Sequence, residues 1–198
     1  MRELPILFND EMVRAVLSGQ KTQTRRPLKA QPNEVWSRPP VWVDQEGYYG
    51  CGIGPLLETR SDLRSPYLVG DRLYVRECFS PDYFGVGKPG FRAGWTDTDL
   101  SQEPKWHPSI HMPKALARIW LEVTVVRVER VQDISFNDAT AEGVFEDFEP
   151  HGGHGFRSEA RRLFFDIWDA CYPGSWDRND WVWVYEFSKT LDIAIELC

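Results

Sequence analysis

A long alternation of apolar and polar side chains, residues 117–131, sets the strongest limit on how this chain can fold. In "ARIWLEVTVVRVERV" every second residue from Ile119 to Val125 is apolar, and from Val126 the apolar residues move to the other face. A bulge near Val125 reconciles the two halves, and bulges are common where a sheet curls into a barrel. The run therefore predicts one long strand of a curled sheet.

Two further segments, residues 72–79 and 181–187, are expected to be strands of the same barrel. In "GDRLYVRECF" the carboxylate of Glu77 falls on the apolar face, where it needs a partner because burial of an unpaired charge is costly. An arginine partner would give Glu77 a structural role, and contact with a ligand would give it a functional one. "DWVWVYEF" is apolar on both faces, which is typical of a strand covered on both sides.

Helices are expected over residues 8–19, 135–143 and 158–174. Asn9 can cap the first of them, and Ser135 and Asp138 have the spacing of a capping box. With the strands, these helices predict an α+β fold: a small, mainly antiparallel sheet curled into a barrel, with the helices at its periphery.

The chain has 198 residues and a net charge of -7, and its length suits one domain with elaborations. Proline and glycine interrupt the patterns, so we expect a single domain, residues 1–198, with insertions at about 29–68, 80–114 and 145–157, the first long and irregular. The acidic balance argues against binding of duplex DNA through the overall field. The cysteines form no CxxC pair, and without a signal peptide or a membrane-length apolar run we expect a cytoplasmic setting.

The segment "SGQKTQTRRPLK", residues 18–29, is strongly basic although the chain is acidic. No Asp or Glu occurs from Met12 to Asn33. The segment is either a solvated turn after a helix or a loop that faces an anion or takes part in catalysis. A local basic patch on an acidic body suits a small anionic ligand or a short single-stranded segment.

Lys21 and Thr24 are the first candidate catalytic pair. Arg25 and Arg26 disfavour the charged form of Lys21, and a neutral lysine can accept the proton of a threonine hydroxyl, which is otherwise a poor nucleophile. In a straight strand, however, Thr24 and Arg26 share one face while Lys21 points to the other. The pair works only if the chain bends just after Gly19 or if the lysine stem curls over.

Glu142 is the third candidate, in the last turn of the helix expected at 135–143. The helix dipole disfavours a carboxylate at that end, so the residue is either exposed and without a role or held there for a purpose. A raised pKa at this position would suit a general acid.

Aromatic residues next to cations offer a different kind of site. Arg92 lies beside Phe91 and close to Trp95, and Lys105 precedes Trp106. Such side chains can stack on a base and clamp it, although core packing also explains them.

A metal site is not expected. Pro108 lies between His107 and His111 and works against the helical geometry that would align both imidazoles. The "HGGH" at 151–154 has no adjoining Cys or acid at ligand spacing. We therefore expect neither a metal nor another cofactor.

Four separated motifs carry a resemblance to a known family. In order and spacing, "LSGQKTQTRR", "GDRLYVRE", "DISFNDATAEGV" and "WVWVYEF" resemble the ASCH domain family, whose fold is a small PUA-like β-barrel related to RNA-binding modules. The variant with "KWHPSIHMP" is similar to the ASCH proteins of phages and prophages. The motifs cover residues 4–28, 69–79, 115–144 and 178–189. The chain is much longer than the minimal enzymes of the family, which implies a reshaped pocket.

The resemblance implies that the chain acts on RNA or modified nucleosides. Some members are amidohydrolases that remove the acetyl group of N4-acetylcytidine, and their motif places the catalytic residues at Lys21, Thr24 and Glu142. In that reaction Thr24 attacks the acyl carbon, Lys21 accepts its proton and Glu142 protonates the departing amine. Other members resemble ribonucleases or bind RNA without known chemistry.

Hydrolysis is favoured over the alternative of a binding module that holds a phosphate or a base edge. The expected partner is a modified nucleoside or single-stranded RNA, and neither duplex DNA nor a membrane is expected. The residues expected to contact the substrate are Arg25, Arg26, Arg76, Glu77, Arg92 and Trp106.

Overall fold

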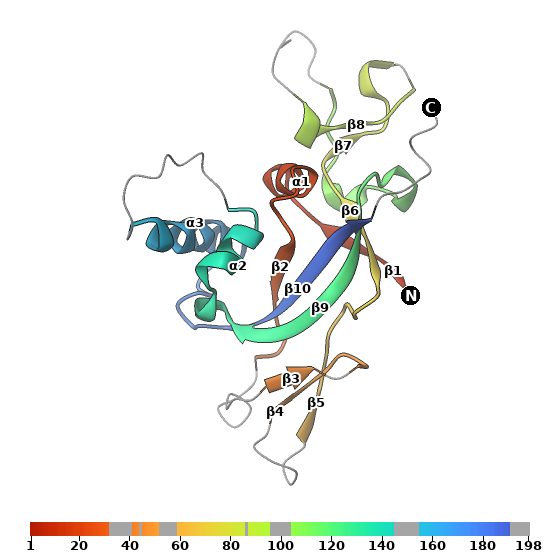
Figure 1. Ribbon diagram of the computed structural model, residues 1–198. Coiled ribbons are helices and arrows are strands. Elements are labelled where there is room, and N and C mark those ends of the chain that lie inside the picture. Colours follow the sequence, from red (N-terminus) through yellow and green to blue (C-terminus); the bar gives the residue numbers. More distant parts are fainter. Residues whose placement is uncertain are drawn as a thin grey trace. The chain divides into compact units, whose positions relative to one another are not determined.

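The computed structural model describes residues 1–31, 41–43, 45–51, 59–85, 87–95, 104–144 and 155–190. Helices and a mixed sheet form the described chain, which confirms the α+β class (Figure 1). Within these residues, no helix is long and apolar enough to cross a membrane.

The chain divides into two compact units, a division that the sequence did not predict. Unit 1 comprises Met1–Gly19, Asp71–Glu122 and Ser188–Cys198, and unit 2 comprises Gln20–Gly70 and Val123–Phe187. Each unit is therefore assembled from segments far apart in the sequence.

A five-stranded sheet has the strand order β1-β6-β9-β10-β2. Its strands are β1 (Glu3–Leu7), β2 (Gln23–Pro27), β6 (Arg72–Arg76), β9 (Trp120–Arg130) and β10 (Trp181–Thr190). β1 is parallel to β6, whereas β6 and β9, and likewise β10 and β2, pair antiparallel. In the part of the chain that the structure describes, no pairing closes this sheet, so the barrel stays a prediction.

The two long strands confirm the sequence patterns. In β9, Leu121 and Val123 are buried and Val125 is exposed, whereas Val128 is buried again on the other face. The change of phase therefore falls where the sequence predicts it. β10 is buried at each position from Trp181 to Tyr185, as expected for a strand covered on both faces.

The segment 72–79 was predicted as one strand, and this prediction is wrong in detail. β6 ends at Arg76, and a separate short strand, β7 (Phe79–Ser80), pairs with β8 (Gly90–Phe91). The interruption falls at Glu77 and Cys78, where the Glu77 amide donates to the sulfur of Met112. The chain then continues through short 3₁₀ helices: η2 (Tyr83–Gly85), η3 (Arg92–Gly94), η4 (Ser109–His111) and η5 (Lys114–Leu116).

The insertion at 29–68 contains a small antiparallel sheet that the sequence did not predict. Its strands are β3 (Val41–Val43), β4 (Tyr48–Cys51) and β5 (Thr59–Arg64), drawn in orange in Figure 1. We expected the aromatic side chains of this insertion to pack on the sheet. That expectation concerns side chains outside the described part of the chain: Trp36, Trp42, Tyr48 and Tyr49.

In unit 1, α1 (Asp10–Leu17) begins as the sequence predicts. The side chain of Asn9 accepts a hydrogen bond from the Met12 amide, and Gly19 adopts a φ of +80° just after the helix. The fully buried apolar side chains of this unit come from β1, α1, β6, β9 and the segment before β9: Ile6, Val13, Val16, Leu73, Val75, Met112, Ile119 and Leu121.

In unit 2, α2 (Phe136–Ala141) packs against α3 (Gly155–Cys171), and both helices share a core with β10 (Figure 1). The 3₁₀ helix η6 (Val131–Asp133) leads from β9 towards α2. The buried members of this core are Val131, Ile134, Ala139, Val144, Ala160, Phe164, Trp168, Val182 and Val184. This core fixes α2 against the strand that borders β2, and α2 carries the candidate acid at its C-terminal end.

We expect Ser135→Ala to lower the free energy of unfolding by about 1 kcal/mol. The Ser135 hydroxyl accepts from the Asp138 amide, and the Asp138 carboxylate accepts from the Ser135 amide, so the predicted capping box is present. Asn137→Ala, an exposed substitution in the same helix, is the matched control. Urea denaturation measures both, and equal midpoints for the two variants would contradict the assigned capping role.

Candidate functional site

Lys21 lies just before β2 and is almost completely buried, with 2% of its surface exposed. Its Nζ donates to the backbone oxygen of Glu142 at 2.8 Å and to Oε2 of the same residue at 2.9 Å. Burial lowers the pKa of Lys21 below 10.5; the Glu142 carboxylate opposes this shift, and Arg26 and Arg25 add to it. The site thus holds a lysine that releases its proton more readily than a free lysine.

Glu142 caps the C-terminal end of α2 and is only 8% exposed. A carboxylate is disfavoured at this end of a helix, but here two cations offset the helix dipole and the cost of burial. Lys21 binds Oε2, and Arg25 donates to Oε1 at 3.1 Å. Of the two interpretations of Glu142, an exposed residue is therefore wrong, because it is buried in an ion-pair cluster.

Arg25 joins three carboxylates on β9 and α2. Besides Glu142, its guanidinium binds Glu129 at 2.9 Å and lies 3.8 Å from Asp138. Burial acts to raise the pKa of Asp138, but the hydrogen bond from Ser135 and the charge of Arg25 lower it on balance. With 1% of its surface exposed, Arg25 neutralises the buried Glu142 and the partly buried Glu129 and Asp138, and its contact with a substrate stays a prediction.

Arg127 extends the same cluster along β9. Its guanidinium donates to Gln23 at 3.0 Å and to Asp138 at 2.8 Å, and it also binds Glu129 and Glu186. The carboxylates missing from the basic segment are therefore supplied by β9, α2 and β10. This part of the cluster was not predicted from the sequence, although the Arg-x-Glu pair that follows the change of phase in β9 indicated it.

Thr24 is completely buried in β2, where the strand register places it opposite Tyr185. Arg26 donates to Thr24 Oγ1 at 2.9 Å and to the backbone oxygen of Arg25 at 2.8 Å. Because a guanidinium only donates, the threonine hydroxyl keeps its own proton for donation to a base. Arg26 also lowers the pKa of Lys21, so its charge acts on both candidate catalytic residues.

In a straight strand Lys21 and Thr24 would point to opposite faces, but β2 begins only at Gln23. Lys21 precedes the strand, so strand alternation does not determine the direction of its side chain. The intervening Thr22 is held by its backbone, which donates to the Ala141 oxygen and accepts from the Phe187 amide. Unit 2 contains all the residues of this candidate site: Lys21, Thr24, Arg25, Arg26 and Glu142.

The other residues predicted to contact a substrate belong to unit 1. Glu77 is fully buried and accepts two hydrogen bonds of 2.9 Å from Arg118, whose guanidinium lies 4.3 Å from the Phe91 ring centroid. Glu77 therefore has the arginine partner that gives it a structural role, and its contact with a ligand stays a prediction. Arg76 donates to the backbone oxygen of Met112 at 2.7 Å.

Arg92 and Trp106 are also engaged within unit 1. Arg92 forms an ion pair with Asp10, and the Trp106 ring lies 5.9 Å from Trp95 and 6.2 Å from Tyr83 between centroids. The Trp106 ring thus packs against other aromatic rings, and contact of Arg92 or Trp106 with a substrate stays a prediction.

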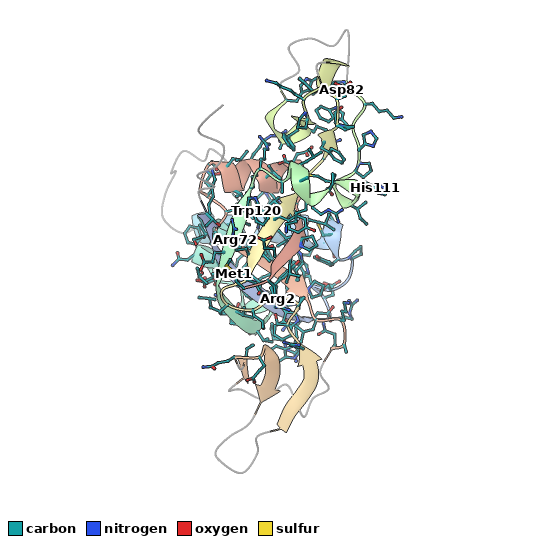
Figure 2. The ribbon with its side chains drawn as sticks, turned by 90° about the vertical axis from the view of Figure 1, so that its right-hand side faces the viewer. Met1, Arg2, Arg72, Asp82, His111 and Trp120 are labelled. Carbon is teal, nitrogen blue, oxygen red and sulfur yellow. The ribbon has the colours of Figure 1, made fainter. Side chains whose placement is uncertain are left out.

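A further cation–aromatic cluster, which the sequence did not predict, lies in unit 1 around Arg72 of β6 and Trp120 of β9, both labelled in Figure 2. Arg72 lies 4.6 Å from the Trp120 ring centroid, and the Tyr74 ring is 5.8 Å from the Trp120 ring. Glu3 pairs with both Arg72 and Lys114, so the acidic residue compensates these cations.

Among the residues that the structure describes, no group of His, Cys, Asp and Glu side chains can hold a metal ion. The histidines of "HGGH" lie outside the described ranges. No protein-family model, curated protein or solved structure matches the chain. The chemistry of the site therefore has to be argued from its own geometry.

Proposed function

We propose that this chain is a PUA-like protein of the ASCH type that acts on modified nucleosides or RNA. In this proposal Lys21, Thr24 and Glu142 hydrolyse the amide of an N4-acylated cytidine, and the open sheet corresponds to the family's small barrel with insertions. The observation that carries the proposal is the burial of Lys21, which lowers the pKa of this lysine while its Nζ donates to Glu142.

The first step requires a nucleophile, a base and a charge to stabilise the nucleophile. Neutral Lys21 accepts the hydroxyl proton of Thr24 as Thr24 Oγ1 bonds to the acyl carbon. Arg26 donates to Oγ1 and stabilises the negative charge that develops on this oxygen. Arg26 also favours the neutral form of Lys21 that this step needs.

The second step expels the amine and then removes the acyl group. The proton passes from Lys21 Nζ to Glu142 Oε2, which are 2.9 Å apart, and from Glu142 to the departing N4 atom of cytidine. The acyl group remains as an ester on Thr24 until water, deprotonated by Lys21, attacks the ester carbon. As the bond from the acyl carbon to Oγ1 breaks, protonated Lys21 returns this proton to Oγ1, which releases the carboxylic acid and regenerates the Thr24 hydroxyl.

A second candidate function, nucleotide binding without chemistry, is favoured by the burial of Thr24. The threonine is 0% exposed, whereas Arg26 is only partly buried and is better placed to contact a base or phosphate. In this alternative Lys21 and Glu142 are a structural ion pair.

A substrate panel separates the two functions. The purified chain is incubated with N4-acetylcytidine, with longer N4-acyl homologues and with short single-stranded RNAs, and products are separated by liquid chromatography. We expect cytidine and the free acid from the acylated nucleosides, with the heat-denatured chain as control. Binding without cleavage of any member of the panel would support the binding module, and cleaved RNA would support a ribonuclease.

A further inference from the structure

The end of the 29–68 insertion is attached to β10 by the buried hydroxyl of Ser65. Its Oγ donates to the backbone oxygen of Tyr67 at 2.6 Å and lies 3.0 Å from the hydroxyl of Tyr185. The Ser65 amide donates to the Gly47 oxygen at 2.7 Å, which ties the segment to the rest of the insertion. Residue 67 is thus held against β10 through Ser65, which is only 2% exposed.

Tyr67 is thereby placed beside Tyr185, the residue opposite the candidate nucleophile. Its ring meets the ring of Tyr185 edge-on, with centroids 5.0 Å apart, and Tyr185 is the cross-strand neighbour of Thr24. Burial raises the pKa of both phenols, and the charge of Arg26 acts against this shift in each of them. Arg26 therefore lies near Tyr67, Tyr185 and Thr24 within unit 2.

The exposures of these residues differ in a way that indicates a substrate contact. Tyr185 and Thr24 are completely buried, whereas Tyr67 and Arg26 are only partly buried. Tyr67 and Arg26 are therefore the members of this group that have surface left to contact a ligand. A phenol ring and a guanidinium are both surfaces on which a nucleobase stacks.

We infer that Tyr67 is a specificity-determining residue that stacks on the base of a nucleoside whose opposite side is contacted by Arg26. The inference rests on the proposed function, because it places the base next to Thr24. It assigns a role to the end of the insertion, which lies outside the motifs that resemble the ASCH family, and the substrate preference of this chain then depends on Tyr67.

The test measures binding of cytidine itself, the product of the proposed reaction, so that it does not depend on turnover. Saturation-transfer NMR and equilibrium titration compare the wild type with Tyr67→Ala, Tyr67→Phe and Ser65→Ala. Tyr74→Ala is the matched control, since Tyr74 is a partly buried tyrosine in unit 1. Thermal unfolding of every variant shows that a loss of binding is not a loss of fold.

We expect Tyr67→Ala to raise the Kd of cytidine by about 5- to 150-fold, the range given by loss of one base–aromatic stack. Tyr67→Phe keeps the ring and should bind within about twofold of the wild type, as should Tyr74→Ala. Ser65→Ala leaves the ring but removes its anchor, so its Kd should lie between those of the two Tyr67 variants.

The outcomes separate this inference from the proposed hydrolysis. Ring-dependent binding without turnover supports the stacking role and overturns the hydrolase. Turnover by the wild type together with unchanged cytidine binding in Tyr67→Ala overturns the stacking role alone. A wild type that neither binds cytidine nor cleaves the acylated nucleosides overturns both.

Discussion

Thr24→Ala is expected to abolish release of cytidine from N4-acetylcytidine, with a loss of at least about a thousandfold in kcat/KM. The substitution removes the oxygen that bonds to the acyl carbon, and the hydrogen bond from Arg26 loses its acceptor. Thr22→Ala is the matched control: this threonine lies two residues earlier and is exposed, and its backbone makes the hydrogen bonds to Ala141 and Phe187. Chromatographic assays on both variants, with circular dichroism for the fold, make the comparison.

Lys21→Arg separates the base from the charge at the same site. An arginine can keep a positive charge near Glu142, but it cannot give up a proton at accessible pH, so the loss should be nearly as large as for Thr24→Ala. In the wild type, activity should rise with pH through the lowered pKa of Lys21, because the neutral form is the base. If Lys21→Arg retains most of the activity on every cleaved substrate, Lys21 is not the base and residues 18–29 form a binding loop.

Local patterns in the sequence were sufficient for the elements that bury one continuous stripe or face. The Asn9 cap, the capping box at Ser135 and the buried run of β10 each depend on neighbours within a few residues. β1 was missed because "ELPIL" is short, contains Pro5 and pairs in parallel with β6, which lies far along the chain. The strands β3, β4 and β5 were missed because proline and glycine surround them.

The candidate site shows the same limit. The residue types of the basic segment indicated a lysine with an unusual pKa, and burial accounts for it. The resemblance brought Glu142 together with Lys21, whereas the residues alone favoured an exposed carboxylate without a role. Neither approach found Glu129 or Arg127, because their position depends on which face of β9 turns towards Arg25 after the change of phase.

Glu142→Gln is expected to destabilise the chain by about 3 kcal/mol near neutral pH, because it leaves the buried Lys21 without its carboxylate. Arg25 keeps Glu129, so Lys21 carries most of the effect. Asp166→Asn is the matched control, since it breaks the exposed ion pair with Arg162 and should change stability little. Urea denaturation of each variant gives the free energies of unfolding.

The dependence of this loss on pH identifies Lys21 as its cause. Between the lowered pKa of Lys21 and 10.5 the unfolded chain binds more protons than the folded chain, so stability rises with pH. Without the Glu142 carboxylate the pKa falls further, and Glu142→Gln should regain part of its stability as the pH increases. The measurements stay below pH 10, because burial raises the pKa of Tyr185 and its ionisation in the unfolded chain then lowers stability.

The double variant Lys21→Met, Glu142→Gln closes the thermodynamic cycle. Methionine fills much of the space of the lysine stem without a charge, and an uncharged replacement of a buried ion pair costs far less than one broken partner. We therefore expect the double variant to be more stable than Glu142→Gln alone and to lose the rise in stability with pH. If the double variant is instead less stable than Glu142→Gln, and the rise persists, then the penalty arises from Arg25 and its carboxylates rather than from Lys21.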